Sequence, residues 1–115
     1  MSISVAPVAP DVYVAPQLDA STMAAVAQAG FRSVVNNRPD FEAGADQPTH
    51  ASIEAAARAA GLEYAFLPVA SMMHSPEQVE RMAALIDSLP RPMLLFCRSG
   101  ARSARLFQAA QQLPR

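Results

Sequence analysis

The feature that most constrains the fold is a short apolar run that ends at the only cysteine of the chain. Met93-Leu94-Leu95-Phe96 precedes Cys97, and Arg98-Ser99-Gly100-Ala101-Arg102-Ser103 follows it. The apolar run predicts a buried strand, the glycine predicts a tight turn, and residues 103–112 predict a helix with one apolar side. Such a turn aims backbone N–H groups inward. Together with the helix N-terminus and Arg102, these groups form a cradle for an anion or a thiolate.

Helices and strands alternate through the rest of the chain, with a glycine after each of the first two helices. Asp19 is the expected cap of a helix that ends near Ala29, and a strand over residues 31–36 follows Gly30. A second helix, over residues 49–60, is followed by Gly61 and a strand over residues 62–68.

Two further elements complete the pattern. Val12 to Ala15 predicts a short strand, and Ser75-Pro76-Glu77-Gln78 predicts the start of a helix through its Ser cap, early Pro and capping-box Gln. Alternating strands and helices imply right-handed crossovers. We therefore expect a three-layer α/β fold: a mostly parallel central sheet with helices on both faces and the strand before Cys97 in the middle.

Length and composition predict one globular domain. The chain has 115 residues, 51% of them hydrophobic and 17% charged, which suits a folded protein rather than a disordered one. Residues 1–10 are small, uncharged or Pro, so a loose arm or an edge extension is expected there, with the single domain over residues 11–115.

The charge pattern predicts a local anion site. All nine basic residues are Arg, the net charge is −1, and Arg98, Arg102 and Arg105 fall within eight residues. A nucleic-acid partner is not expected from so small a cluster. His50 and His74 lack the spacing of metal ligands, so neither a metal nor a cofactor is expected. Without an apolar run of membrane length or a signal peptide, we expect no membrane association and a cytoplasmic location.

Cys97 has two interpretations. A positive setting lowers the pKa of a thiol from about 8.5 to roughly 3.5–7.5, which creates a nucleophile. The alternative is an inert core thiol, because free Cys is among the most buried residue types. The strand end, the glycine turn, the arginines and the helix start favour the nucleophile.

A polar loop after the strand over residues 31–36 adds a second candidate contact. Asn36-Asn37-Arg38-Pro39-Asp40 begins where that strand ends, and the carboxyl ends of parallel strands are where α/β proteins build sites. Arg38 is thus a candidate anion contact. The alternative, given equal weight, is a turn shaped by Asn37, Pro39 and Asp40 with a solvated Arg38.

These two motifs resemble known families. CRSGARS is similar to the active-site signature of single-domain rhodanese sulfurtransferases. Together with NNRPD, it makes residues 10–113 resemble the DUF442 family, also described as the phosphatase-like domain of beta-lactamase-hydrolase-like proteins. The resemblance implies the fold of the dual-specificity and tyrosine phosphatases, (phosphotyrosine protein phosphatase)-like, with a cysteine loop shaped more like that of a rhodanese.

The departures from the phosphatase signature favour sulfur transfer. Tyrosine phosphatases place five residues between Cys and Arg, whereas four separate Cys97 from Arg102 here, and Phe96 stands where those enzymes usually have His. Their general-acid Asp also lacks a counterpart, because residues 68–74 contain no carboxylate. His74 is the only substitute in that loop, and a role in packing or at the surface is favoured for it.

The first hypothesis is therefore a rhodanese-type sulfurtransferase that carries a persulfide on Cys97. The resemblance implies that Arg102 orients the donor, that Ser103 hydrogen-bonds Cys97 and that Gly100 permits the turn. The backbone N–H groups of the turn are expected to hold the charged intermediate. The turn residues expected to contact it are Arg98, Ser99, Gly100, Ala101 and Ser103.

The expected donor is a small sulfur anion, thiosulfate or a persulfide, and the expected acceptor is a thiol or cyanide. In related proteins the domain is fused to a persulfide dioxygenase, so such a sulfide-oxidising enzyme is a candidate partner. Two alternatives remain open: a tyrosine or dual-specificity phosphatase-like hydrolase with a Cys97 phosphoenzyme, and a non-catalytic oxyanion-binding module.

Overall fold

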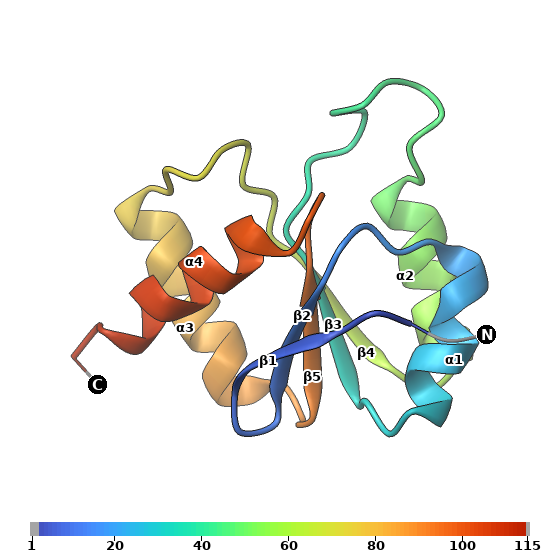
Figure 1. The fold of residues 1–115 in the computed structure, drawn as a ribbon, viewed down its shortest axis with the longest axis horizontal. Coiled ribbons are helices and arrows are strands. Elements are labelled where there is room, and N and C mark those ends of the chain that lie inside the picture. Colours follow the sequence, from blue (N-terminus) through green and yellow to red (C-terminus); the bar gives the residue numbers. More distant parts are fainter. Residues whose placement is uncertain (1–2, 115) are drawn as a thin grey trace.

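A five-stranded sheet in the order β1-β2-β5-β3-β4 organises the computed structural model, which describes residues 3–114 (Figure 1). The strands are β1 (Ala6–Ala9), β2 (Val12–Ala15), β3 (Ser33–Asn36), β4 (Glu63–Phe66) and β5 (Met93–Phe96). The helices are the 3-10 turn η1 (Ala20–Thr22) and the α-helices α1 (Met23–Gln28), α2 (His50–Ala59), α3 (Pro76–Ser88) and α4 (Ala101–Gln111).

Helices cover both faces of the sheet, which confirms the predicted three-layer α/β fold. Figure 1 shows α3 and α4 on one side of the strands and α1 and α2 on the other. The alternation of side chains along β5 divides the core accordingly: Leu95 belongs to the cluster under α3 and α4, whereas Leu94 and Phe96 belong to the cluster under α1 and α2. A strand buried on both faces reads as a continuous apolar run, as the sequence does here.

Local signals fix most helix boundaries. Ser75 accepts a hydrogen bond from the Gln78 N–H at 3.1 Å and completes a capping box at the start of α3. Thr49 caps α2 as expected. Two starts differ from prediction. Asp19 caps the 3-10 turn η1, which leads into α1. Helix α4 begins at Ala101, two residues before the expected start, because Gly100 acts as its N-cap.

The N-terminal segment contains an edge strand. Residues 6–9 form β1, which pairs antiparallel with β2 and shifts register between Pro7 and Ala9. The prediction of a loose arm is therefore wrong for these four residues, which form the edge extension that was the other prediction. The cause is the reversal at Asp11, whose φ of 64° turns the chain back along β2. Residues 1 and 2, part of the predicted arm, lie outside the described residues.

The central position of β5 brings four loops to one edge of the sheet. Strand β5 runs parallel to β2 on one side and to β3 on the other, as expected, and β4 continues the parallel set. Backbone hydrogen bonds join the loops that follow these strands: Gln17 N–H to Arg98 O at 3.2 Å, Asn37 N–H to Phe96 O at 2.8 Å and Val69 N–H to Asn37 O at 2.8 Å. This edge, uppermost in Figure 1, carries the Cys97 turn.

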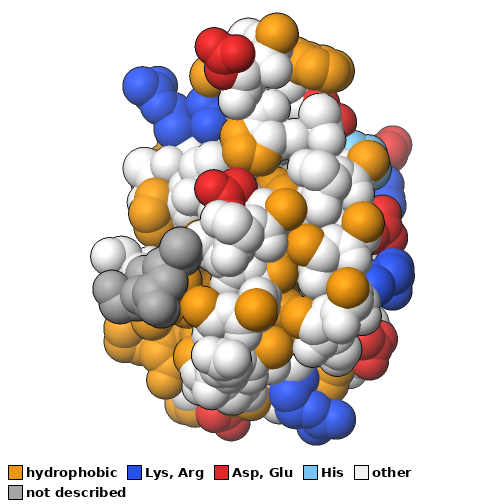
Figure 2. Space-filling view, turned by 90° about the vertical axis from the view of Figure 1, so that its right-hand side faces the viewer, with side chains coloured by type: hydrophobic (Ala, Val, Ile, Leu, Met, Phe, Trp, Pro, Cys, Tyr) orange, Lys and Arg blue, Asp and Glu red, His pale blue; other side chains and the backbone are white. Residues whose placement is uncertain are grey.

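No helix within residues 3–114 is long and apolar enough to cross a bilayer. Figure 2 shows that the face over α1 and α2 carries hydrophobic side chains scattered among polar atoms, with charged side chains around the margin.

Candidate active site

Cys97 lies directly after β5 in a turn whose N–H groups point at its sulfur. The Gly100 N–H donates to Cys97 Sγ at 3.1 Å. Burial of Cys97 opposes ionisation, but hydrogen bonds from the N–H and hydroxyl of Ser103 and from the N–H groups of Ser99 and Gly100 outweigh it and lower the pKa of the thiol. The turn therefore favours a thiolate, which is the nucleophilic form.

Gly100 allows the turn to take this shape. Its φ of 96° is left-handed, a conformation that other residues adopt only with strain. A Cβ there would lie 3.5 Å from the Ala15 carbonyl oxygen, an ordinary contact, so the backbone conformation is what requires glycine. This conformation aims the Gly100 N–H at the sulfur and starts α4 at Ala101, so the N-terminus of α4 faces Cys97.

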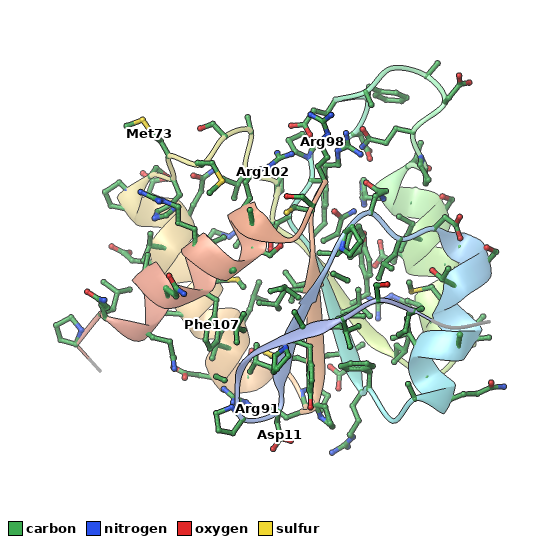
Figure 3. The ribbon with its side chains drawn as sticks, in the orientation of Figure 1. Asp11, Met73, Arg91, Arg98, Arg102 and Phe107 are labelled. Carbon is green, nitrogen blue, oxygen red and sulfur yellow. The ribbon has the colours of Figure 1, made fainter. Side chains whose placement is uncertain are left out.

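Arg102 reaches from the first turn of α4 over the loops after β3 and β4. Its two terminal nitrogens donate to the Glu42 carboxylate at 2.7 and 2.6 Å, and one of them also donates to the Val69 carbonyl at 2.8 Å. Within residues 3–114, its Nε–H has no hydrogen-bond partner, so this edge of the guanidinium remains available to an anion. Figure 3 shows Arg102 and Arg98 at the same end of the sheet.

Glu42 joins the two arginines of the site. Besides Arg102, its carboxylate accepts from Arg38 Nε at 2.8 Å, and Arg38 also donates to Gln17 Oε1 at 3.1 Å. Arg38 is 7% exposed, so the expectation of a solvated Arg38 is wrong. The hydrogen bond from Arg102 is the largest of the effects that hold the pKa of Glu42 at about 2, against burial that raises it. Glu42 raises the pKa of Arg102 in return.

Two consecutive asparagines fasten the loop after β3. The Asn36 side-chain oxygen accepts a hydrogen bond from the Arg38 N–H at 2.9 Å, and its Nδ2 donates to the Tyr64 hydroxyl at 3.1 Å. Asn37 donates to the Leu67 carbonyl at 2.9 Å and accepts from the Ser103 hydroxyl at 2.8 Å. All these atoms lie in the interior. The pair therefore places Arg38 and links the loop to α4.

Sequence reasoning missed the roles of Glu42 and Asn37. The general acid was expected in residues 68–74, after β4, whereas Glu42 lies after β3. Its one sequence signal is the four-residue spacing from Arg38, which matches their ion pair. The NNRPD motif contained Asn37, but only the fold shows that it meets Ser103.

The other predicted contacts divide into two groups. Ser99, Gly100 and Ser103 contact the sulfur through their N–H groups. Ala101 is exposed at the start of α4, and Arg98 is exposed with its carbonyl bonded to Gln17 N–H. Their role in anion binding stays a prediction.

A proton donor for a leaving group is not evident. Glu42 is ionised at neutral pH because its pKa is about 2, so it cannot act as a general acid. Within residues 3–114, His74 forms no hydrogen bond to Cys97 or Arg102. Neither Glu42 nor His74 therefore supplies a proton to a leaving group in this arrangement.

The sulfur is closed off in this conformation. Cys97 is 0% exposed, and Arg102, held by Glu42 and Val69, is only 11% exposed in its side chain. A substrate anion reaches Cys97 only after side chains at this edge move.

Comparisons with known proteins identify the family of the chain. The sequence model of the phosphatase-like domain of beta-lactamase hydrolase-like proteins matches residues 4–114. A beta-lactamase hydrolase-like protein of Xylella fastidiosa is 34% identical over 85 residues, which cover 74% of this chain and 20% of that protein. The chain thus spans about a fifth of the length of that curated relative.

Solved structures share the fold. A candidate phosphatase from Neisseria meningitidis superposes with a TM-score of 0.81 at 30% identity, over 94% of this chain and 78% of that one. Tk-PTP in its active form has a TM-score of 0.70 at 16% identity, over 99% of this chain and 87% of that one, which shows the fold alone. The fold, the Cys97 turn and the family match lead to one conclusion: the chain belongs to the DUF442 family, the phosphatase-like domain of beta-lactamase hydrolase-like proteins.

Proposed function

We propose that this domain is a cysteine-dependent, phosphatase-like hydrolase that acts through a Cys97 phosphoenzyme. The observation that carries the proposal is the ring of N–H groups around Cys97 Sγ, with the charge of Arg102 near enough to interact with that of the thiolate. The phosphatase-like family and the candidate phosphatase from Neisseria meningitidis support this reading over sulfur transfer, the first hypothesis from the sequence.

The chemistry proceeds in two displacements. The Cys97 thiolate attacks phosphorus, an S–P bond forms, and the P–O bond to the leaving group breaks with its electron pair on oxygen. Water then attacks phosphorus, releases inorganic phosphate and returns Cys97 as the thiolate. The N–H groups of Ser99, Gly100 and Ser103 and the Nε–H of Arg102 stabilise the charge on the phosphoryl oxygens.

The substrate class follows from the missing acid. With Glu42 ionised and no carboxylate in residues 68–74, neither position supplies a proton to the leaving oxygen. Esters with acidic leaving groups, such as aryl phosphates, are therefore expected to react well, and alkyl phosphates poorly.

Sulfur transfer is the second candidate, and the four-residue spacing between Cys97 and Arg102 favours it. The thiolate attacks the outer sulfur of thiosulfate, an S–S bond forms, and sulfite leaves with the electron pair of the broken bond. Cyanide or a thiol then takes the outer sulfur from the persulfide. No general acid is needed. A persulfide dioxygenase as partner and a cytoplasmic location stay predictions from the sequence.

One experiment separates these readings. The reduced protein is given an aryl phosphate, and in parallel thiosulfate followed by cyanide, with Cys97→Ser as the control. Phosphate release that disappears in Cys97→Ser supports the phosphatase-like reaction. Thiocyanate without phosphate release would overturn it in favour of sulfur transfer. Anion binding with neither product would identify an oxyanion-binding module.

A further inference from the structure

Asn37 and Ser103 meet in the interior beside Cys97, although 66 residues separate them. The Ser103 hydroxyl donates to Asn37 Oδ1 at 2.8 Å. Asn37, Ser103 and Cys97 are all 0% exposed. Polar groups buried in this way depend on each other for hydrogen bonds, so the loss of a partner is not readily made good by water.

The position of the Asn37 amide is fixed. Its Nδ2 donates to the Leu67 carbonyl at 2.9 Å, and a carbonyl can only accept, so Oδ1 must face Ser103. The Asn37 N–H donates to Phe96 O, and the Asn37 carbonyl accepts from Val69 N–H, both at 2.8 Å. Bonds to β5 and to the loop after β4 thus hold the acceptor in place.

The Ser103 hydroxyl has two acceptors and one proton. The observed bond, at 2.8 Å, goes to Asn37 Oδ1, whereas a hydrogen bond from the same hydroxyl to the ionised sulfur is among the interactions that lower the pKa of Cys97. While Cys97 is a thiol, Ser103 donates to Asn37, and its oxygen can accept the S–H. When Cys97 ionises, its proton leaves to solvent, and a hydrogen bond from Ser103 to the thiolate would use the proton that Asn37 Oδ1 receives in this structure. Ser103 would keep its proton, but Asn37 Oδ1 would lose its donor.

We infer that Asn37 is a positioning residue that sets how readily Cys97 ionises, by competing with its sulfur for the Ser103 proton. The inference rests on the proposed function, because it concerns the same nucleophile, and it adds a residue from the loop after β3. Removal of the Asn37 acceptor releases the hydroxyl to the thiolate and lowers the pKa of Cys97. Removal of the Ser103 hydroxyl raises that pKa.

Other ionisable groups near the turn stay the same in this comparison. The elements around Cys97 carry the following charged or titratable residues: Asp19 after β2, Arg38, Asp40, Glu42 and Asp46 after β3, His50 at the start of α2, Tyr64 on β4, His74 after β4, and Arg98, Arg102 and Arg105 after β5. The charge of Arg102 interacts with that of Cys97. None of these residues changes in the variants below, so differences in the Cys97 titration report on Asn37 and Ser103.

The test is a double-mutant cycle on the pKa of Cys97. Cys97 is the only cysteine, so the ultraviolet absorbance of the thiolate as a function of pH follows this residue. Asn37→Ala is expected to lower the pKa by up to about one unit, and Ser103→Ala to raise it. The double variant is expected to titrate like Ser103→Ala. An unchanged or raised pKa in Asn37→Ala, or an equal decrease in the Ser103→Ala background, would overturn the inference.

Asn36→Ala is the matched control. Asn36 is also buried, and its amide bonds Tyr64 and the Arg38 N–H instead of Ser103. Loss of the Asn36 side chain is expected to leave the pKa of Cys97 unchanged. A decrease as large as that in Asn37→Ala would attribute the effect to general loosening of the loop and contradict the inference.

A second measurement needs no change at Asn37. In the wild-type protein, the side-chain amide resonances of Asn37 are expected to shift with the midpoint of Cys97 ionisation, and Ser103→Ala is expected to abolish most of that shift. A shift that persists undiminished in Ser103→Ala would show a direct effect of charge and overturn the inference. These titrations use no substrate, so a failure of the proposed hydrolase activity would be seen separately.

Discussion

Glu42 is the residue on which the charge balance of the site depends. It receives hydrogen bonds from Arg38 and Arg102, whose side chains are 9% and 11% exposed. Without the carboxylate, two nearly buried guanidinium groups would face each other unpaired. Burial of an unpaired charge is costly, so this residue contributes to stability as well as to the site.

Glu42→Gln is therefore expected to destabilise the fold by about 1.5–3 kcal/mol, the range for hydrogen bonds to charged groups. The measurement is urea unfolding at neutral pH. Glu54→Gln is the control, because the Glu54–Arg58 pair is exposed and such helical pairs contribute only about 0.3–0.5 kcal/mol. Equal losses in the two variants would contradict a special role for Glu42.

The contribution of Glu42 also predicts a pH dependence. Folding lowers the pKa of Glu42 from 4.5 to about 2, so ionisation of its carboxyl group stabilises the native state. This contribution to the free energy of unfolding is fully present above pH 4.5 and is lost as the pH falls toward 2. The gap in unfolding free energy between wild type and Glu42→Gln should shrink over that interval. A gap that stays constant or grows as the pH falls would show that the carboxylate charge is not its source.

Arg102 is the other residue with a direct prediction. A lysine carries the charge but not the fork that holds Glu42 and Val69 while it presents Nε–H to an anion. Arg102→Lys is expected to lower kcat/KM for an aryl phosphate about 100-fold, the scale for loss of one oxyanion donor. Arg105→Lys, on the exposed side of α4, should stay near wild type. Similar losses in both would exclude a particular role for Arg102.

At the scale of elements, the junction between β5 and α4 is the decisive one. Gly100 has φ of 96° and caps α4, while Gly61 has φ of 84° after α2, with nothing within 4 Å of an added Cβ. The two positions share the same kind of backbone strain, but only Gly100 directs an N–H at Cys97.

Gly100→Ala and Gly61→Ala are each expected to lower stability by about 1–2 kcal/mol, because alanine is disfavoured at positive φ. Only Gly100→Ala should also raise the pKa of Cys97, since a displaced N–H stabilises the thiolate less. Thermal unfolding and the thiolate titration check the two effects. An unchanged thiol pKa in Gly100→Ala would show that its N–H is not needed for ionisation.

For the whole molecule, the strand order predicts where stability concentrates. Strand β5 lies between β2 and β3 and its side chains are buried on both faces, whereas β1 is an edge strand whose residues are exposed or half-buried. Amide hydrogen exchange should therefore be slowest in β5 and β3 and fastest in β1. Mass spectrometry of exchanged peptides tests this order. Protection of β1 equal to that of β5 would mean that the edge strand belongs to the most stable unit.

The sequence by itself determined most of the helices and strands and the identity of the turn. The cap at Ser75, the glycines at 30 and 61 and the apolar run before Cys97 are local signals, and each acts within a few residues. Alternation of helices with strands then predicted the layered sheet with β5 in its centre. The CRSGARS and NNRPD motifs predicted the family correctly. Each motif is a contiguous stretch, so it can be recognised without knowledge of the tertiary structure.

Only the tertiary structure decided which side chains meet at that turn. Glu42 and Arg102 are 60 residues apart, and Asn37 and Ser103 are 66 apart. Their contacts depend on β3 lying beside β5 and on the path of the loop after β3, and no local pattern encodes either. The pairing of β1 with β2 was likewise open, since small residues and prolines suit an arm as well as an edge. Local propensity fixes elements, whereas long-range packing selects the partners of charged and polar groups.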